Sequence, residues 1–265
     1  MDSLFRFSNY DLFAYVAAGF AAFVVADLGW GAHLVLCAHW TTASGVVTVV
    51  AAYVVGHLIA GPSEWLIGKR FVGKMLGPPA EVFFPTPPPD AAPSEKKPTK
   101  PWLATCLRRL LPGYFEPLDD RLKARILAHA LNEGEHERDL HGESFFWIAY
   151  PRAKRDPLTH ARMDTFLTLY GFCRNLAFVG LFGGIVLAVQ AALRSMHVYG
   201  ATQIGYGAAE PCKLLAWAVL AFLLGLVLLY RYVIFYRHYA SEVFVGYMEL
   251  PPGAGGGGGS GSEAE

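Results

Sequence analysis

Apolar residues in this chain collect in long blocks and do not follow the spacing of an amphipathic helix or strand. Four blocks of 17 or more residues cover 12 to about 38, 43–60, 176–193 and 214–230, with Asp27 as the one acidic residue inside the first. A helix rises about 1.5 Å per residue, so each block approaches the roughly 30 Å needed to cross the hydrocarbon of a bilayer. The pattern predicts an all-α integral membrane protein with four transmembrane helices packed as a bundle.

Composition and charge placement support a membrane location. Hydrophobic residues make up 54% of the chain and charged residues 17%, against about 25% charged in a typical soluble domain. Arg174 and Arg194 are 20 residues apart around the third block, and Lys213 and Arg231 are 18 apart around the fourth. Cations at this spacing reach opposite interfaces of one bilayer. We therefore expect all four to act as interface anchors.

The distribution of Lys and Arg predicts the orientation. The stretch 61–164 holds 16 of the 22 Lys and Arg residues, whereas the turn between the first two blocks holds none. Positive loops stay on the cytosolic side of a membrane. We expect both termini and the long middle segment in the cytosol, and the protein in the inner (plasma) membrane. The first block is too long for a signal peptide, so we expect it to remain as a helix.

Small residues recur every fourth position in three of the blocks. Helices in lipid associate by close backbone approach along such faces, because lipid is as apolar as leucine. The fourth block is rich in leucine and is the one we expect to face lipid most. The predicted packing residues are Ala18, Ala22, Thr48, Ala52, Gly56, Gly180, Gly184 and Ala188.

Between the second and third blocks we expect a cytosolic helical insertion. Gly61-Pro62 should end the second helix, and nine prolines between 78 and 101 should prevent regular structure there. Amphipathic helices are expected over 117–132 and 144–155, and Asp156-Pro157 should start a helix that runs into the third block. The predicted parts are 1–77 (helices one and two with an interfacial helix at 65–75), 78–101 (proline-rich linker), 102–163 (cytosolic helical segment), 164–250 (helices three and four with cytosolic extensions) and 251–265 (flexible tail).

The fourth helix continues beyond its membrane block with an aromatic stripe. We expect it to pack with the extension of the third helix, and the helix at 117–132 to cover its apolar side. The same stripe is the predicted cytosolic interaction face for a protein partner or a second copy of the chain. Its residues are Tyr232, Phe235, Tyr236 and Tyr239.

Polar residues inside the apolar blocks are the candidates for membrane chemistry. Asp27, His57 and Asn175 are costly to bury in lipid, so each is a functional hypothesis by default. We favour the interpretation that these side chains form interhelical hydrogen bonds. The alternative is that they form a proton or ion path. Outside the membrane, the histidine- and glutamate-rich stretch 129–143 lacks a zinc-binding spacing. No catalytic or phosphate-binding motif occurs, so we expect no enzyme, no metal, no cofactor and no nucleic-acid partner.

Cysteine placement leaves two readings open. Cys37 and Cys212 both fall at the predicted outer face. A disulfide between them requires an oxidising compartment. Free thiols are the favoured reading.

Two short segments carry a resemblance to a known group of proteins. They are Ser8-Asn9-Tyr10-Asp11-Leu12-Phe13-Ala14-Tyr15 and Leu169-Tyr170-Gly171-Phe172-Cys173-Arg174-Asn175-Leu176, each leading into an apolar helix. Both resemble segments of uncharacterised bacterial four-helix inner-membrane proteins encoded near phage-defence operons. The resemblance implies a membrane effector that perturbs the inner membrane when a cytosolic sensor fires.

Two functions therefore remain. The first is a non-enzymatic effector or scaffold controlled through its cytosolic helices, motivated by the aromatic stripe and the small-residue faces. The second is an oligomeric ion or proton channel, or a small transporter, that uses Asp27 and His57. The bilayer is the expected partner in both.

Overall fold

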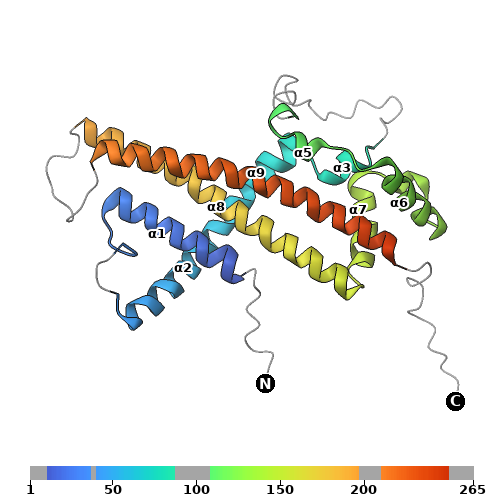
Figure 1. The fold of residues 1–265 in the computed structure, drawn as a ribbon, viewed down its shortest axis with the longest axis horizontal. Coiled ribbons are helices and arrows are strands. Elements are labelled where there is room, and N and C mark those ends of the chain that lie inside the picture. The colour runs from blue at the N-terminus through green and yellow to red at the C-terminus, as the bar shows by residue number, and fades with distance from the viewer. Residues whose placement is uncertain (1–10, 37–39, 87–107, 197–209, 251–265) are drawn as a thin grey trace, which may run out of the picture. The chain divides into compact units, whose positions relative to one another are not determined.

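The computed structural model describes residues 11–36, 40–86, 108–196 and 210–250, and every element in these ranges is a helix (Figure 1). The predicted all-α class is confirmed for this part of the chain. Along the sequence the elements are η1 (Asp11–Val16), α1 (Ala17–Trp30), α2 (Thr42–Ser63), η2 (Glu64–Leu76), α3 (Pro79–Phe83), α5 (Pro112–Phe115), α6 (Asp120–Asn132), η3 (Glu137–Asp139), α7 (Gly142–Ala153), α8 (Pro157–Ser195) and α9 (Pro211–Glu249).

Three helical runs are long and apolar enough to cross a membrane. They are Thr42–Phe83, Pro157–Ser195 and Pro211–Glu249. The first predicted span is represented by the shorter apolar helix Ala14–Trp30. It ends at Trp30 because Gly31 adopts a left-handed conformation and donates its N–H to the Asp27 carbonyl. The predicted block of 12–38 is therefore only partly helical.

The chain divides into two compact units. The first comprises Met1–Lys74 and Leu167–Phe235, and the second comprises Met75–Phe166 and Tyr236–Glu265. Both α8 and α9 contribute residues to each unit. The first part of α8 and the last part of α9, which the sequence predicts as extensions beyond the apolar blocks, fall in the second unit.

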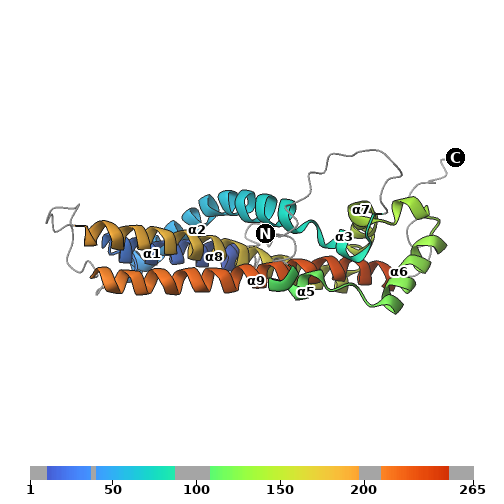
Figure 2. The same ribbon diagram turned by 90° about the horizontal axis from the view of Figure 1, so that it is seen from above.

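Helices of the first unit pack through glycine. A Cβ on Gly19 would overlap the Ala52 backbone, and one on Gly56 would overlap the Tyr15 carbonyl. These contacts bring α2 against η1 and α1. In the same unit α8 and α9 lie side by side (Figures 1 and 2), and a Cβ on Gly180 would lie 2.8 Å from the Cα of Gly225. Backbones this close leave no room for larger residues.

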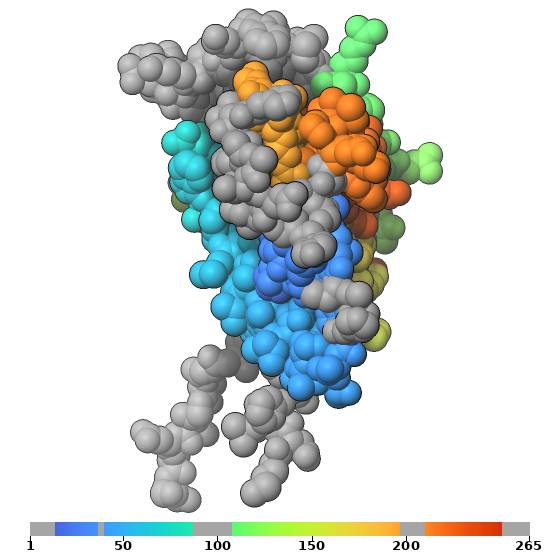
Figure 3. All heavy atoms as spheres, turned by 90° about the vertical axis from the view of Figure 1, so that its left-hand side faces the viewer, coloured from blue at the N-terminus to red at the C-terminus, as the bar shows by residue number. Residues whose placement is uncertain are grey.

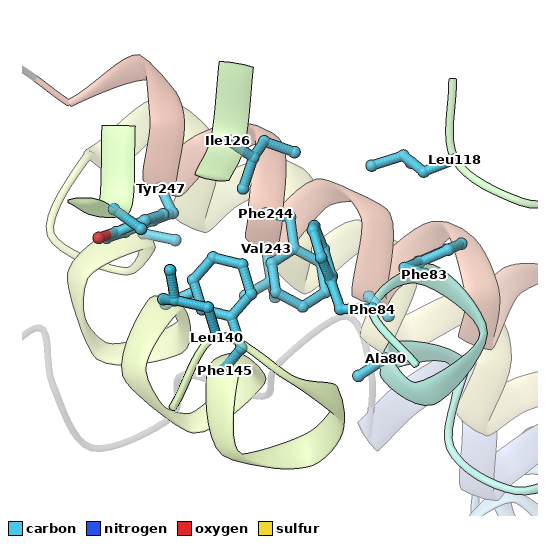
Figure 4. Packing of buried hydrophobic residues seen from close by; sticks show 14 of the residues in the cluster. Ala80, Phe83, Phe84, Leu118, Ile126, Leu140, Phe145, Val243, Phe244 and Tyr247 are labelled. Atoms are coloured by element: carbon cyan, nitrogen blue, oxygen red, sulfur yellow. The ribbon is translucent and has the colours of Figure 1, made fainter. Parts of the chain in front are cut away.

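The second unit has its own hydrophobic core. Phe84 of the segment after α3, Phe145 of α7 and Phe244 of α9 form an aromatic centre, with ring centroids 4.8–5.1 Å apart (Figure 4). Each ring is at most 2% exposed, and burying one such ring contributes about 1.5–3 kcal/mol. Ile126 of α6 joins Val243 in this core. As predicted, α6 covers the apolar side of the α9 extension.

Two predictions about prolines are wrong. The second helix does not end at Gly61-Pro62: Pro62 lies inside α2, and the chain continues as the π-helix η2. The helix loses one backbone hydrogen bond at the proline and accommodates it. The start of the predicted linker is also helical, since Pro79 begins α3. Proline is well suited to a first helical turn, where its missing N–H is not needed.

Other boundaries agree more closely with the sequence. Asp156 caps α8 as predicted, with its Oδ2 accepting from the Thr159 backbone N–H at 2.8 Å. Helix α6 begins at Asp120, three residues later than expected, because Asp119 accepts the N–H groups of the first turn. The rest of the proline-rich linker, the glycine-rich tail and Cys37 lie outside the described residues, so the predictions made for them stay predictions.

Candidate functional site

Asp27 closes a loop at the end of α1. Its carboxylate accepts backbone N–H groups from Leu34, Val35 and Leu36 at 2.7, 2.8 and 2.8 Å. The residue is only 7% exposed. A carboxylate that accepts three backbone hydrogen bonds is held in its charged form and in one position. The bonds stay within one segment, whereas an interhelical bond was expected. Asp27 therefore has a structural role in this geometry.

His57 lies on the exposed side of α2 between two tyrosines. Its ring centroid is 3.9 Å from that of Tyr15 and 4.6 Å from that of Tyr53. The imidazole itself is exposed. Figure 3 shows α1 and α2, both in blue, side by side at the surface. Tyr15 of η1 and Tyr53 and His57 of α2 thus form a polar and aromatic cluster beside the apolar residues of α2.

Asn175 connects three helices of the first unit. Its Oδ1 accepts from the Ser63 hydroxyl at 2.6 Å, and its Nδ2 donates to the Ala14 carbonyl at 3.4 Å. Asn175 and Ser63 are both fully buried. Arg174 also donates from Nε to Oδ1 at 3.4 Å. The sequence pointed to Asn175 as polar but did not reveal Ser63, which lies 112 residues away.

The four expected interface anchors occupy different environments. Lys213 is exposed and pairs with Glu210 at 3.5 Å, and Arg231 is also exposed. Arg194 donates from Nη2 to the carbonyl of Gly29 at 2.6 Å, where α1 ends. Arg174 is 9% exposed, so it is buried within the protein and not free at a surface.

The predicted packing residues are mostly enclosed. Ala18 and Ala52 are fully buried, and Gly56 meets the Tyr15 backbone. Gly184 faces the Ala218 carbonyl at 2.9 Å from an added Cβ. The other four are half-buried: Ala22, Thr48, Gly180 and Ala188. Ala188 packs beside a small apolar cluster, and the Thr48 hydroxyl donates to a carbonyl of its own helix.

The aromatic stripe of α9 is largely covered by the chain itself. Tyr232 is 4% exposed, and its ring lies 5.9 Å from that of Tyr170. Phe235, Tyr236 and Tyr239 are half-buried. Burial raises the pKa of the Tyr236 hydroxyl. Large aromatic side chains gain most when they are buried, which agrees with the expected packing of this stripe inside the chain. The predicted role of the stripe as an interaction face stays a prediction.

Arg162 forms a cluster that sequence reasoning missed. Its guanidinium contacts Glu242 at 2.8 Å and Glu249 at 2.9 Å, so one arginine of α8 binds two carboxylates of α9. It also donates to the Thr159 hydroxyl at 3.2 Å. Burial raises the pKa of Glu242, and the nearby Arg162 opposes that rise.

Arg152 of α7 forms a second cluster at the end of α9. It pairs with Glu135 at 2.5 Å and Glu133 at 3.5 Å, and it donates to the Tyr247 hydroxyl at 3.1 Å. Burial raises the pKa of Tyr247, against the effect of Arg152. Two arginines therefore hold the end of α9 to α7, to α8 and to the loop after α6. No local sequence motif indicates these pairs, because most of the partners are 80 or more residues apart. The exceptions are the pairs of Arg152 with Glu133 and Glu135.

Glu133 and Glu135 belong to the histidine- and glutamate-rich stretch 129–143, and both form ion pairs with Arg152. His129 lies 5.1 Å from the Tyr247 ring. Among the described residues no group of three or more His, Cys, Asp and Glu side chains is placed to hold a metal ion.

Comparison with known proteins found no matching family model, no similar curated protein and no similar solved structure. A function for this chain has to be argued from its own geometry.

Proposed function

We propose that this protein is a non-enzymatic membrane effector in which the second unit receives a partner or ligand and changes how the membrane helices pack. The concentration of Lys and Arg in the middle segment supports a cytosolic position for the second unit. Following the resemblance of the two short segments, we propose perturbation of a bacterial inner membrane during antiviral defence as the setting.

One observation carries the proposal: α8 and α9 each supply core residues to both units. Met163 and Leu187 of α8 lie in the cores of the second and first units, respectively, and Val243 and Leu214 of α9 do the same. Both helices are unbroken over 39 residues. A change in the second unit that moves either helix must alter packing in both cores, because close-packed interiors transmit small displacements.

We propose that the change in the second unit begins at the two arginine clusters, around Arg162 and Arg152. Arg162 holds the end of α9 by a hydrogen bond to Glu249 and an ion pair with Glu242. Arg152 holds it by a hydrogen bond to Tyr247. Hydrogen bonds that involve a charged group are the stronger kind. A partner that competes for these carboxylates or arginines would release α9 from α8 or α7. Switches of this kind bias an element that has two arrangements, and need no catalysis.

Membrane potential and dye entry in cells test the proposal. The chain is expressed alone and together with the proteins encoded beside it. We expect depolarisation that depends on a partner and is lost in Arg162→Ala. The matched control is Arg138→Ala, since the Arg138 side chain is 81% exposed and its ion pair is with its neighbour Asp139 at 3.9 Å. Equal activity of both variants would contradict control through the α8–α9 cluster.

An oligomeric proton or ion path is the second candidate, and His57 is the observation that favours it. An exposed imidazole in a membrane helix is costly unless another polar surface covers it. Copies of the chain that meet along α2 would bring several such rings together. Loss of depolarisation in His57→Ala, with full activity in Arg162→Ala, would favour this path over the effector.

A further inference from the structure

A half-open cavity of about 210 Å³ lies in the second unit. Its floor is formed by Phe84 and Leu140, which are each 2% exposed and belong to the core. Leu127 and Leu131 of α6 form one wall. The apolar lining is therefore continuous with the rigid core of the unit.

Three polar side chains also line this cavity. Lys123 comes from the same face of α6 as Leu127, Glu137 from η3 and His141 from the residue before α7. The Lys123 ammonium lies 5.7 Å from the centre of the Phe84 ring. Within the described residues none of these three side chains has an ion pair or a hydrogen bond. An apolar pocket with a few convergent polar groups is the usual form of a small-molecule site.

The size and charge of the cavity define its ligand. An apolar cavity of about 150 Å³ is known to bind benzene, so a volume of 210 Å³ accommodates one ring or a branched chain with a small polar group. Lys123 supplies a cation, and His141 supplies a hydrogen-bond donor. Glu137 disfavours a second negative charge on the ligand. We infer that this cavity binds a small monocarboxylate with a compact apolar body, held through its carboxylate by Lys123.

Only the consequence of binding, that such a ligand controls the effector, rests on the proposed function. The cavity wall includes α6, which packs on the α9 segment that contains Val243 and Tyr247. Occupation of the cavity would stabilise the arrangement of α6 that holds α9. Binding itself is independent of any membrane effect.

The test uses benzoate and its neutral analogue benzamide with the full chain in nanodiscs, followed by titration calorimetry. We expect saturable binding of benzoate that is at least about tenfold tighter than that of benzamide, since a charge-assisted bond contributes more than a neutral one. Lys123→Met should remove this preference. The matched control is Lys154→Met, because Lys154 also lies over an aromatic ring, that of Tyr150 at 5.9 Å. It should bind benzoate as the unchanged chain does.

A second variant tests the cavity and not the charge. Leu127→Trp fills the space and should abolish binding of both compounds, with the circular dichroism spectrum used to confirm folding. Equal binding of benzoate and benzamide, no saturable binding of benzoate, or unchanged benzoate binding in Lys123→Met would each overturn the inference. Partner-dependent depolarisation without benzoate binding would contradict the cavity site and leave the proposed function standing. Benzoate binding without any membrane response would support the cavity site and contradict the proposed function.

Discussion

Thr159 of α8 packs its methyl group against Gly246 of α9 so closely that a Cβ at position 246 would overlap Thr159 Cγ2. Thr159 is fully buried, and its hydroxyl donates to Asp156 Oδ2 at 2.7 Å. The residue that packs against α9 thus also binds the Asp156 carboxylate, which caps the start of α8. Arg162 and its two carboxylates lie one turn further along the same helix. The crossing and the ion pairs form one structural element of the second unit.

Gly246→Ala should destabilise the second unit by about 1–3 kcal/mol, as overpacking of a tight site does. Alanine is a better helix former than glycine, so any loss of stability reports the clash. Thermal unfolding of the full chain in detergent measures it. Thr159→Ser removes the methyl group and keeps the capping hydroxyl, so it should restore much of the loss in the double variant. Additive losses in the two variants would refute a direct contact.

Gly56→Ala should separate α2 from η1, because its Cβ would overlap the Tyr15 backbone. Backbone atoms cannot move aside as a flexible side chain can, so we expect a clear drop in thermal stability. Gly61→Ala is the control within the same helix, since nothing lies within 4 Å of its added Cβ. It should leave the stability unchanged or raise it slightly. Similar losses for both variants would show that glycine matters there for reasons other than packing.

Sequence reasoning succeeded where the signal is local or linear. The all-α class follows from the length of the apolar blocks, which one-dimensional counting detects directly. The start of α8 was read from Asp156-Pro157, because an N-cap and a first-turn proline act within three residues. The cover of the α9 extension by α6 followed from two apolar faces that both needed burial.

Sequence reasoning failed where partners are distant or where loops fold back. Ser63 and Asn175 form one buried pair across 112 residues, and nothing in either local pattern indicates the other. Asp27 binds a loop that the sequence suggested was part of the helix. Both relationships are set by how the chain folds and not by a local residue pattern.

Asp27→Asn should loosen the loop that follows α1. An amide offers one acceptor oxygen and turns its NH₂ group toward a backbone donor, so at least one of the three N–H groups loses its partner. The loss should amount to about 1–3 kcal/mol, which corresponds to roughly 5–150 times faster amide exchange at the affected positions. Hydrogen exchange at Leu34, Val35 and Leu36 measures it, with the amides of α9 as an internal control.

A transport role for Asp27 leads to the opposite pattern. If Asp27 handles ions, Asn should change depolarisation and leave exchange in the loop as it was. Protection of Leu34–Leu36 equal to that of the unchanged chain would therefore contradict the structural role of this carboxylate.

Glu242 provides a test by pH. Burial raises the pKa of its carboxyl group above the usual 4.5 in spite of the nearby Arg162. A carboxyl group whose pKa rises on folding stabilises the fold fully below its unfolded pKa, and this contribution is lost as the pH rises through the folded pKa. The second unit should therefore lose the Glu242 contribution between pH 4.5 and the raised pKa.

Glu242→Gln removes the titration and keeps the shape of the side chain. At about pH 4 the variant should match the unchanged chain, because the carboxyl is then mostly protonated in both states. At about pH 7 the variant should unfold at a higher temperature, since replacing a partly buried charge can stabilise even when an ion pair is lost. Glu249→Gln is the control, because its carboxylate on the same arginine is 50% exposed and exposed pairs contribute little. A variant that is less stable than the unchanged chain at neutral pH would mean that the attraction of Arg162 outweighs burial, and that the arginine cluster is held together mainly by charge.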